Sequence, residues 1–139
     1  MLAQEKADAV QEVRLFEPMR VLVVDDSPTI RRALRQLLQT QVDIEVIGEA
    51  ADGTDGIRKT QIYKPDVILM DAAMPTMNGF DAVRQIKKES PSTQVLMVSQ
   101  YDSDALTREA LAAGAIGYIL KSNASKQLIP ALKEIRAAD

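Results

Sequence analysis

Residues 67–70 are four apolar residues in a row, and this run leads directly into a carboxylate at Asp71. An unbroken apolar run of this length is typical of a strand covered on both faces, as in a parallel sheet between two layers of helices. In open parallel sheets, ligands bind in the crevice at the carboxyl ends of the strands. Asp71 therefore has a functional interpretation, although a lone Asp at this point is more simply a turn residue or a helix cap.

Apolar strands and amphipathic helices alternate along the chain. Strands are expected at residues 21–24, 44–47, 67–70, 95–98 and 117–120. Helices are expected after Ser27-Pro28, over residues 54–63, from Asn78-Gly79, from about Asp102 to Gly114, and after a cap at Ser125. This order predicts an α/β fold, a doubly wound parallel sheet with right-handed crossovers. The strand at 44–47 carries a charge and is expected at an edge.

Two helical segments carry more detailed expectations. In the first helix, Arg31, Arg32 and Arg35 lie off the apolar stripe, so we expect them to form a solvated face or, as an alternative, to dock an acidic partner. In the helix over residues 54–63, Ile57 and Ile62 are the expected apolar anchors.

Length and composition indicate one domain. With 139 residues, 46% of them hydrophobic, the chain can form one substantial core. We predict an N-terminal tail or short helix over residues 1–18 and a single domain over residues 19–139. No apolar run approaches the ~20 residues of a membrane span, and no cationic segment leads into an apolar one, so a cytoplasmic protein without membrane contact is expected.

The residue types that are missing restrict the chemistry. The sequence contains no histidine, which removes the commonest general base and the commonest neutral metal ligand. A metal must therefore sit on oxygen ligands, and any reaction must use carboxylate, hydroxyl or amine groups. The absence of cysteine fits a reducing compartment. The net charge of -3 gives no general attraction to nucleic acid, so no direct nucleic-acid binding is expected.

The unusual polar residues follow the strands. Asp25 and Asp26 follow the first strand, Asp71 the third, Ser99 the fourth and Lys121 the fifth. In a parallel sheet these exits share one edge, so the groups are expected to converge. Like-charged pairs at ~4 Å cost roughly 1 to 4 kcal/mol each, which a divalent cation such as Mg²⁺ would relieve. Ser99 and Lys121 offer a hydroxyl donor and a compact positive charge that suit phosphoryl oxygens.

These groups predict a phosphoryl-transfer site in which a carboxylate is the nucleophile. Asp71 is the expected acceptor because it lies on the central strand, between the metal acids Asp25 and Asp26 and the cation Lys121. Each residue taken singly also has a simpler interpretation as a turn, a cap or a solvated strand end.

Four stretches carry a resemblance to a known family. They are Val-Leu-Val-Val-Asp-Asp, then Pro-Asp-Val-Ile-Leu-Met-Asp followed by Met-Pro and Asn-Gly, then Val-Leu-Met-Val-Ser, and last Ala-Gly-Ala-Ile-Gly-Tyr-Ile-Leu-Lys. Through them, residues 20–137 resemble the receiver domain of two-component response regulators. The resemblance implies a flavodoxin-like (βα)5 fold with strand order 2-1-3-4-5, and phosphorylation by a sensor histidine kinase that signals to a downstream output domain or protein.

The resemblance also implies residue roles. Asp71 would be the phosphoacceptor and would ligate Mg²⁺ together with Asp26 and the carbonyl of Ala73. Asp25 would bind Mg²⁺ through water. By the same resemblance, Ser99 would be the switch hydroxyl, Tyr118 the switch aromatic and Lys121 the phosphate contact. The sequence departs from the family at three places: Gln100 follows Ser99, Ser122 replaces the usual proline, and Ala73 with Tyr101 occupies two positions that tune hydrolysis of the acyl phosphate.

Further expectations concern partners. Residues 43–50 resemble regulators whose receiver precedes a helix-turn-helix DNA-binding domain, which these 139 residues do not include. The Ala- and Leu-rich surface of residues 105–119 is a candidate face for a homodimer formed on phosphorylation.

Three alternatives remain open. One is an unphosphorylated receiver-like interaction module. Another is a metal-dependent phosphatase acting through an aspartyl phosphate, although Ala73 stands where such enzymes resembling the haloacid dehalogenase group place a second Asp. The last is a nucleotide-binding module, although Asp25 and Asp26 would repel a phosphate.

Overall fold

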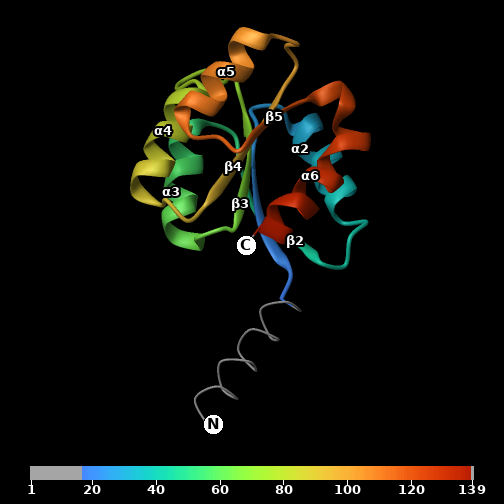
Figure 1. The fold of residues 1–139 in the computed structure, drawn as a ribbon. Coiled ribbons are helices and arrows are strands. Elements are labelled where there is room, and N and C mark those ends of the chain that lie inside the picture. The colour runs from blue at the N-terminus through green and yellow to red at the C-terminus, as the bar shows by residue number, and fades with distance from the viewer. Residues whose placement is uncertain (1–16, 139) are drawn as a thin grey trace.

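The computed structural model describes residues 17–138, in which strands and helices alternate along the chain (Figure 1). The strands are β1 (Met19–Val24), β2 (Ile44–Ala50), β3 (Val67–Asp71), β4 (Gln94–Ser99) and β5 (Gly117–Leu120). The helices are α2 (Pro28–Leu38), α3 (Gly53–Tyr63), α4 (Gly79–Glu89), α5 (Asp104–Ala113) and α6 (Ala124–Ala138), with a 3₁₀ turn η1 (Lys121–Asn123) before α6. The expected tail or short helix lies almost entirely outside the described residues, so the domain boundary at residue 19 stays a prediction.

The five strands form one parallel sheet in the order β2-β1-β3-β4-β5. This order confirms the predicted doubly wound fold, and β2 lies at an edge, as its mixed sequence indicated. Helices α2 and α6 cover one face of the sheet, and α3, α4 and α5 cover the other (Figure 1). Because all strands run the same way, their carboxyl ends meet at one edge of the sheet.

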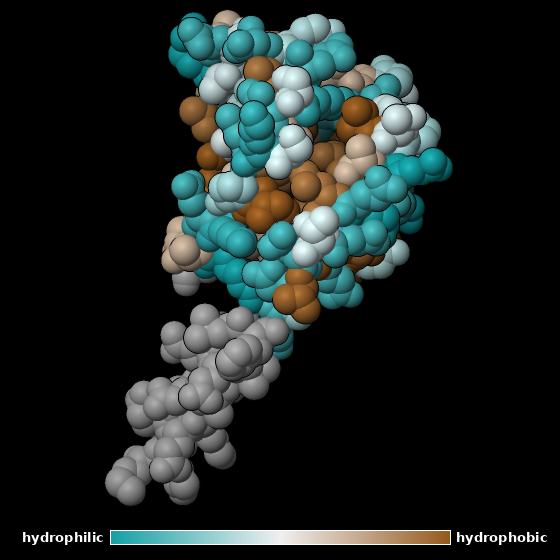
Figure 2. Space-filling model, turned by 90° about the vertical axis from the view of Figure 1, so that its right-hand side faces the viewer, coloured by the Kyte–Doolittle hydropathy of each residue, from teal (hydrophilic) through white to brown (hydrophobic). Residues whose placement is uncertain are grey.

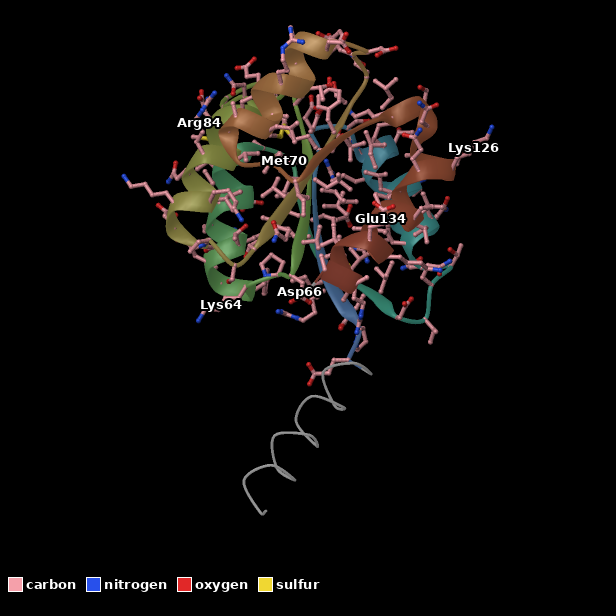
Figure 3. The ribbon with its side chains drawn as sticks, viewed as in Figure 1. Lys64, Asp66, Met70, Arg84, Lys126 and Glu134 are labelled. Carbon is pink, nitrogen blue, oxygen red and sulfur yellow. The ribbon has the colours of Figure 1, made fainter. Side chains whose placement is uncertain are left out.

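Each face of the sheet has its own hydrophobic core, because successive side chains of a strand point to opposite faces. Val21 and Val23 of β1 pack with α2 and α6, whereas Leu22 and Val24 pack with the helices on the other face. Met70 of the central strand β3 is fully buried in the core on the α3–α5 side (Figure 3). The apolar strands are therefore covered on both sides, as predicted.

Strand β2 contains a bulge that decides which of its side chains face α2. The pairing register between β1 and β2 shifts by one residue after Val21, which makes Ile47 an extra residue in β2. The shift places Glu49 level with Val23, whose side chain packs on the α2 side of the sheet. An unshifted register would turn Glu49 to the opposite face. The bulge thus brings a carboxylate to the side on which α2 lies.

Several helix ends follow the local signals in the sequence. The Ser27 hydroxyl accepts a hydrogen bond from Ile30 N at 3.2 Å, and Pro28 is the first residue of α2. The side chain of Asn78 caps α4 in the same way. Gly114 ends α5 with φ 112°, a left-handed conformation that glycine adopts without steric cost.

Three expectations at the level of the helices are wrong. Ser125 does not cap the last helix, because η1 leads directly into α6 and Ser125 lies inside it. Ile62 does not anchor α3, because 58% of its surface is exposed. The expected solvated face holds for Arg32, which is exposed, but not for Arg31 and Arg35, because both bind the carboxylate of Glu49.

The surface over α2 and α6 is mixed in character. Leu37 and Ile129 are half-buried against the core on this side, and Figure 2 shows apolar side chains gathered in a recess among hydrophilic ones. Lys126 of α6 points away from the sheet (Figure 3). Within residues 17–138, every helix is too short or too polar to span a bilayer.

Candidate functional site: an acidic pocket at the edge of the sheet

Three carboxylates lie together at the carboxyl edge of the sheet. Asp25 and Asp26 directly follow β1, and Asp71 is the last residue of the neighbouring strand β3. One carboxylate oxygen from each residue lies within 4.8 Å of the other two. Asp25 and Asp71 are buried, with 1% and 4% of their surface exposed, whereas Asp26 is exposed. The pocket is therefore negative inside and open to solvent on the side of Asp26.

Lys121 brings a positive charge to this pocket. It is the first residue after β5, and its Nζ lies 2.8 Å from Asp25 Oδ2 and 3.4 Å from Asp71 Oδ1. The sequence places Lys121 far from both acids, and the parallel sheet brings them together, as predicted. If all three acids are ionised, Lys121 leaves the pocket with a net charge of -2 (three carboxylates and one ammonium).

Every hydrogen-bonding group of Asp25 has a partner. One carboxylate oxygen, Oδ1, accepts from Ser27 N at 2.9 Å, and the other accepts from Lys121. The amide of Asp25 donates to the Ala50 carbonyl at 3.0 Å, and its own carbonyl accepts from Arg31 Nη1 at 2.7 Å. Asp25 is thus held in a single orientation by bonds from β2, α2 and the chain after β5.

Asp71 is positioned by the turn that follows it. Ala73 N donates to Asp71 Oδ1 at 3.3 Å, and Gly79 N donates to the Ala72 carbonyl at 2.9 Å, so the start of α4 folds back onto the end of β3. A Cβ atom on Gly79 would lie 2.1 Å from the Asp71 carbonyl oxygen, far inside van der Waals contact. Only glycine allows this close approach of the two backbones.

Burial raises the pKa of Asp71 to about 6, and the charge of Asp25 acts in the same direction, whereas Lys121 opposes both. Burial also disfavours the charged form of Lys121. Its hydrogen bond to Asp25 and the charges of Asp71 and Asp25 outweigh that effect, so the pKa of Lys121 is raised. Lys121 alone therefore does not neutralise the pocket, and an additional cation would stabilise the ionised form of Asp71.

The donor set of the pocket fits Mg²⁺. All three side chains offer hard oxygen ligands, and the exposure of Asp26 leaves room for water or phosphate oxygens to complete the coordination. A divalent cation would also cancel the net charge of -2. The residues that would hold it are Asp25, Asp26 and Asp71. Ala73 lies beside Asp71 and is exposed, and the role of its carbonyl as a ligand stays a prediction.

Ser99 and Tyr118 both form hydrogen bonds with the backbone of Tyr101. The Ser99 hydroxyl accepts from Tyr101 N at 3.1 Å, and the Tyr118 hydroxyl donates to the Tyr101 carbonyl at 2.6 Å. Ser99 is buried at the end of β4, beside the strand that ends in Asp71, and Tyr118 is half-buried on β5. One residue of the β4–α5 loop thus joins the two predicted switch side chains.

Sequence reasoning missed two residues that shape this pocket. The sequence predicts a helix from Asn78-Gly79, and no local pattern signals the close approach of Gly79 to the Asp71 carbonyl oxygen. The position of Arg31 off the apolar stripe predicts a solvated face or a docking site. Its spacing gives no signal for the contact with Glu49, because that contact depends on the register of β2.

Comparisons with known proteins agree with this geometry. The family model of the response regulator receiver domain matches residues 21–133. The response regulator protein VraR of Staphylococcus aureus is 42% identical over 116 residues, which cover 84% of this chain and 56% of VraR. The uncharacterized transcriptional regulatory protein YxjL of Bacillus subtilis is 38% identical over 117 residues, 84% of this chain and 54% of YxjL. The chain thus spans about half the length of these relatives.

Solved structures show the same fold. A LuxR-family two-component response regulator from Aurantimonas sp. is 30% identical with a TM-score of 0.84, covering 88% of this chain and 87% of that one. The response regulator domain of Thermotoga maritima CheB is 40% identical with a TM-score of 0.77, covering 88% of this chain and 96% of that domain. The expected similarity to receivers of transcriptional regulators is confirmed. The acidic pocket, the strand order and these matches together show that the chain belongs to the receiver domain family of two-component response regulators.

Proposed function

We propose that this domain accepts a phosphoryl group on the carboxylate of Asp71 in a Mg²⁺-dependent reaction and thereby switches an output surface. The observation that carries the proposal is the convergence of three carboxylates and Lys121 at one edge of the sheet. Asp71 is the proposed acceptor because it ends the central strand between the other two acids and the lysine.

The proposed step is a displacement at phosphorus. An oxygen of the ionised Asp71 carboxylate attacks the phosphorus of a phosphohistidine, a P–O bond forms, and the P–N bond breaks. The leaving imidazole keeps the electron pair of that bond and takes up a proton. Bound Mg²⁺ would stabilise negative charge on the transferring phosphoryl oxygens. Lys121 Nζ, at 3.4 Å from Asp71 Oδ1, is placed to contact an oxygen of the new acyl phosphate.

The phosphoryl donor comes from another protein in this proposal. The 139 residues contain no histidine, so they cannot carry a phosphohistidine of their own. Membership of the receiver family implies a partner histidine kinase as donor. Such a kinase draws its phosphoryl group from ATP, and we place the reaction in the cytoplasm on that ground.

The proposed switch runs through the β4–α5 loop. Ser99 and Lys121 together can give an acyl phosphate two charge-assisted hydrogen bonds, worth roughly 3 to 6 kcal/mol in total. About 5.5 kcal/mol moves a two-state equilibrium from 1:99 to 99:1. If Ser99 turns toward the phosphoryl group, the hydrogen bond from Tyr101 N to its hydroxyl is lost. The Tyr118 side chain then moves with the loop, because its hydroxyl donates to the Tyr101 carbonyl.

The surface that responds would lie on α5 and β5. Leu111 of α5 and Ile116, the residue before β5, are exposed there, at 50% and 42% of their surface. We propose this region as the contact surface for an output domain or protein, or for a second copy of the chain. Direct binding of nucleic acid is not part of the proposed role.

The experiment is an intact mass measurement after incubation with acetyl phosphate and Mg²⁺. One added phosphoryl group is expected in the parent protein and none in Asp71→Asn or in the parent with EDTA. Unchanged mass under all conditions would favour the unphosphorylated interaction module. Steady release of phosphate from an aryl phosphate would favour the phosphatase.

A further inference from the structure

Arg31 connects helix α2 to the backbone between the first two acids of the pocket. Its Nη1 donates to the Asp25 carbonyl oxygen at 2.7 Å, and its Nε lies 3.3 Å from Glu49 Oε1. Arg31 is the fourth residue of α2, and Glu49 belongs to the edge strand β2, so a single guanidinium joins three segments. Only 19% of the Arg31 side-chain surface is exposed, so water competes weakly for these contacts.

Glu49 is itself held firmly. Its other carboxylate oxygen, Oε2, accepts from Arg35 Nε at 3.1 Å and from Arg35 Nη2 at 2.8 Å. Its backbone carbonyl accepts from the Lys59 ammonium, which also pairs with Asp55 at 3.0 Å. The bulge in β2 turns Glu49 toward α2 in the first place. Glu49 is thus a fixed anchor for Arg31.

The contact with the Asp25 carbonyl has a consequence for Asp26. The carbonyl of Asp25 and the amide of Asp26 belong to one planar peptide group, so a bond that fixes the carbonyl oxygen fixes the plane. The plane sets the direction in which the Asp26 backbone, and with it the Asp26 side chain, continues. Asp26 is the exposed member of the three acids, so it has the least support from burial.

We propose that Arg31, anchored by Glu49, is a positioning residue that holds the peptide between Asp25 and Asp26 so that both carboxylates converge on one divalent cation. Arg31 touches neither the cation nor the phosphoryl group in this proposal, and acts through the peptide group. The inference rests on the proposed function, because it assigns a purpose to the cation site described above.

Arg35 provides a matched control, because it bonds the same Glu49 carboxylate but has no bond to Asp25 among the described residues. The test is to titrate ¹⁵N-labelled Arg31→Gln and Arg35→Gln with MgCl2 and to compare their dissociation constants for Mg²⁺ with that of the parent. Arg31→Gln is expected to weaken Mg²⁺ binding by about 10-fold or more, the scale on which partners of metal ligands act. Arg35→Gln is expected to change it by about two-fold or less, as for a partly exposed ion pair. Equal weakening in both variants, or none in Arg31→Gln, overturns the proposal.

A second readout does not depend on the cation. The Ser27 amide donates to Asp25 Oδ1, so its hydrogen exchange reports on the order of this turn. Without Mg²⁺, Arg31→Gln is expected to speed this exchange by about 10-fold, the effect of losing one charge-assisted hydrogen bond. Arg35→Gln should leave it near the parent rate, whereas similar acceleration in both variants contradicts a positioning role.

The two measurements distinguish a failure of this proposal from a failure of the proposed function on which it rests. If the parent protein binds no Mg²⁺, the proposed function fails, and the exchange of the Ser27 amide alone decides whether Arg31 positions the turn. If Arg31→Gln does not fold, Arg31→Lys is compared with Arg35→Lys. A lysine keeps one donor for the Asp25 carbonyl but loses the second contact with Glu49. Arg31→Lys is then expected to show the larger loss of Mg²⁺ affinity, and a loss no larger than that of Arg35→Lys overturns the proposal.

Discussion

The carboxylate of Asp71 is buried beside Asp25, with Lys121 Nζ and the Ala73 amide as its polar partners. Its pKa of about 6 in the folded protein, raised first by burial and then by the charge of Asp25, lies above the 3.8 of an exposed aspartate. Between these two values the folded state binds more protons than the unfolded state. The free energy of unfolding therefore falls as the pH rises from about 4 to about 6, and the loss persists above that range.

The variant Asp71→Asn tests this linkage. Without divalent cations at pH 8, we expect Asp71→Asn to raise the free energy of unfolding by about 1 to 3 kcal/mol, because the cost of ionising a buried acid disappears. Urea unfolding in EDTA at pH 4 and pH 8 measures this, and the gain should vanish at pH 4. A variant that is less stable than the parent at pH 8 would show that the Lys121 contact outweighs burial.

Gly79 supports Asp71 through backbone contact. A Cβ atom at Gly79 would lie 2.1 Å from the Asp71 carbonyl oxygen, and backbone atoms cannot move aside as a flexible side chain can. Gly79→Ala is therefore expected to lower the free energy of unfolding by about 3 kcal/mol, the upper part of the range for overpacking. Gly48→Ala is the control, since a Cβ there makes ordinary contact with Leu22 at 3.4 Å. Similar stability losses in both variants would count against the close-contact argument.

At the scale of elements, the β4–α5 loop is held by Ser99 and Tyr118, the two proposed switch side chains. Tyr118→Phe removes only the hydroxyl that donates to the Tyr101 carbonyl. Because that bond is exposed, we expect a loss of about 0.5 to 1 kcal/mol in the free energy of unfolding. Amide exchange at Tyr101 should also become faster. No change in that exchange would mean that the Tyr118 hydroxyl does not restrain the loop.

Much of the secondary structure could be predicted because its signals are local. Apolar runs mark the strands, and Ser27 and Asn78 cap helices through side chains a few residues from their partners. The bulge in β2 could not be predicted, because it depends on pairing with β1, and therefore the partner of Arg31 could not be predicted either. Ser125 looks like a cap only if the 3₁₀ turn before α6 is unknown.

The grouping of the site residues could be predicted at the scale of the whole molecule. A parallel sheet places all strand exits at one edge, so Asp25, Asp71 and Lys121 meet although the sequence separates them widely. The details within the group depend on packing. Which acid is exposed, and the fact that Ser99 and Tyr118 share Tyr101, follow from the arrangement of loops and not from any local pattern.

The proposed cation site would link the pocket to the stability of the whole molecule. If Mg²⁺ binds only the folded state, a concentration ten times its dissociation constant raises the free energy of unfolding by about 1.4 kcal/mol. Urea unfolding with and without MgCl2 measures this, with NaCl at matched ionic strength as the control. Asp26→Asn removes the exposed carboxylate of the cluster and should lose most of the gain at the same Mg²⁺ concentration. Equal stabilisation by NaCl would indicate screening of the acids without a specific site.

The most direct test of the central claim is to find the residue that carries the phosphoryl group. Borohydride reduces an acyl phosphate to an alcohol, which converts a phosphorylated aspartate into homoserine at the same position. After incubation with acetyl phosphate and Mg²⁺, peptide mass spectrometry should find homoserine at position 71. Homoserine at position 25 or 26, or at none of the acids of the pocket, would contradict the assignment of Asp71 as the phosphoacceptor.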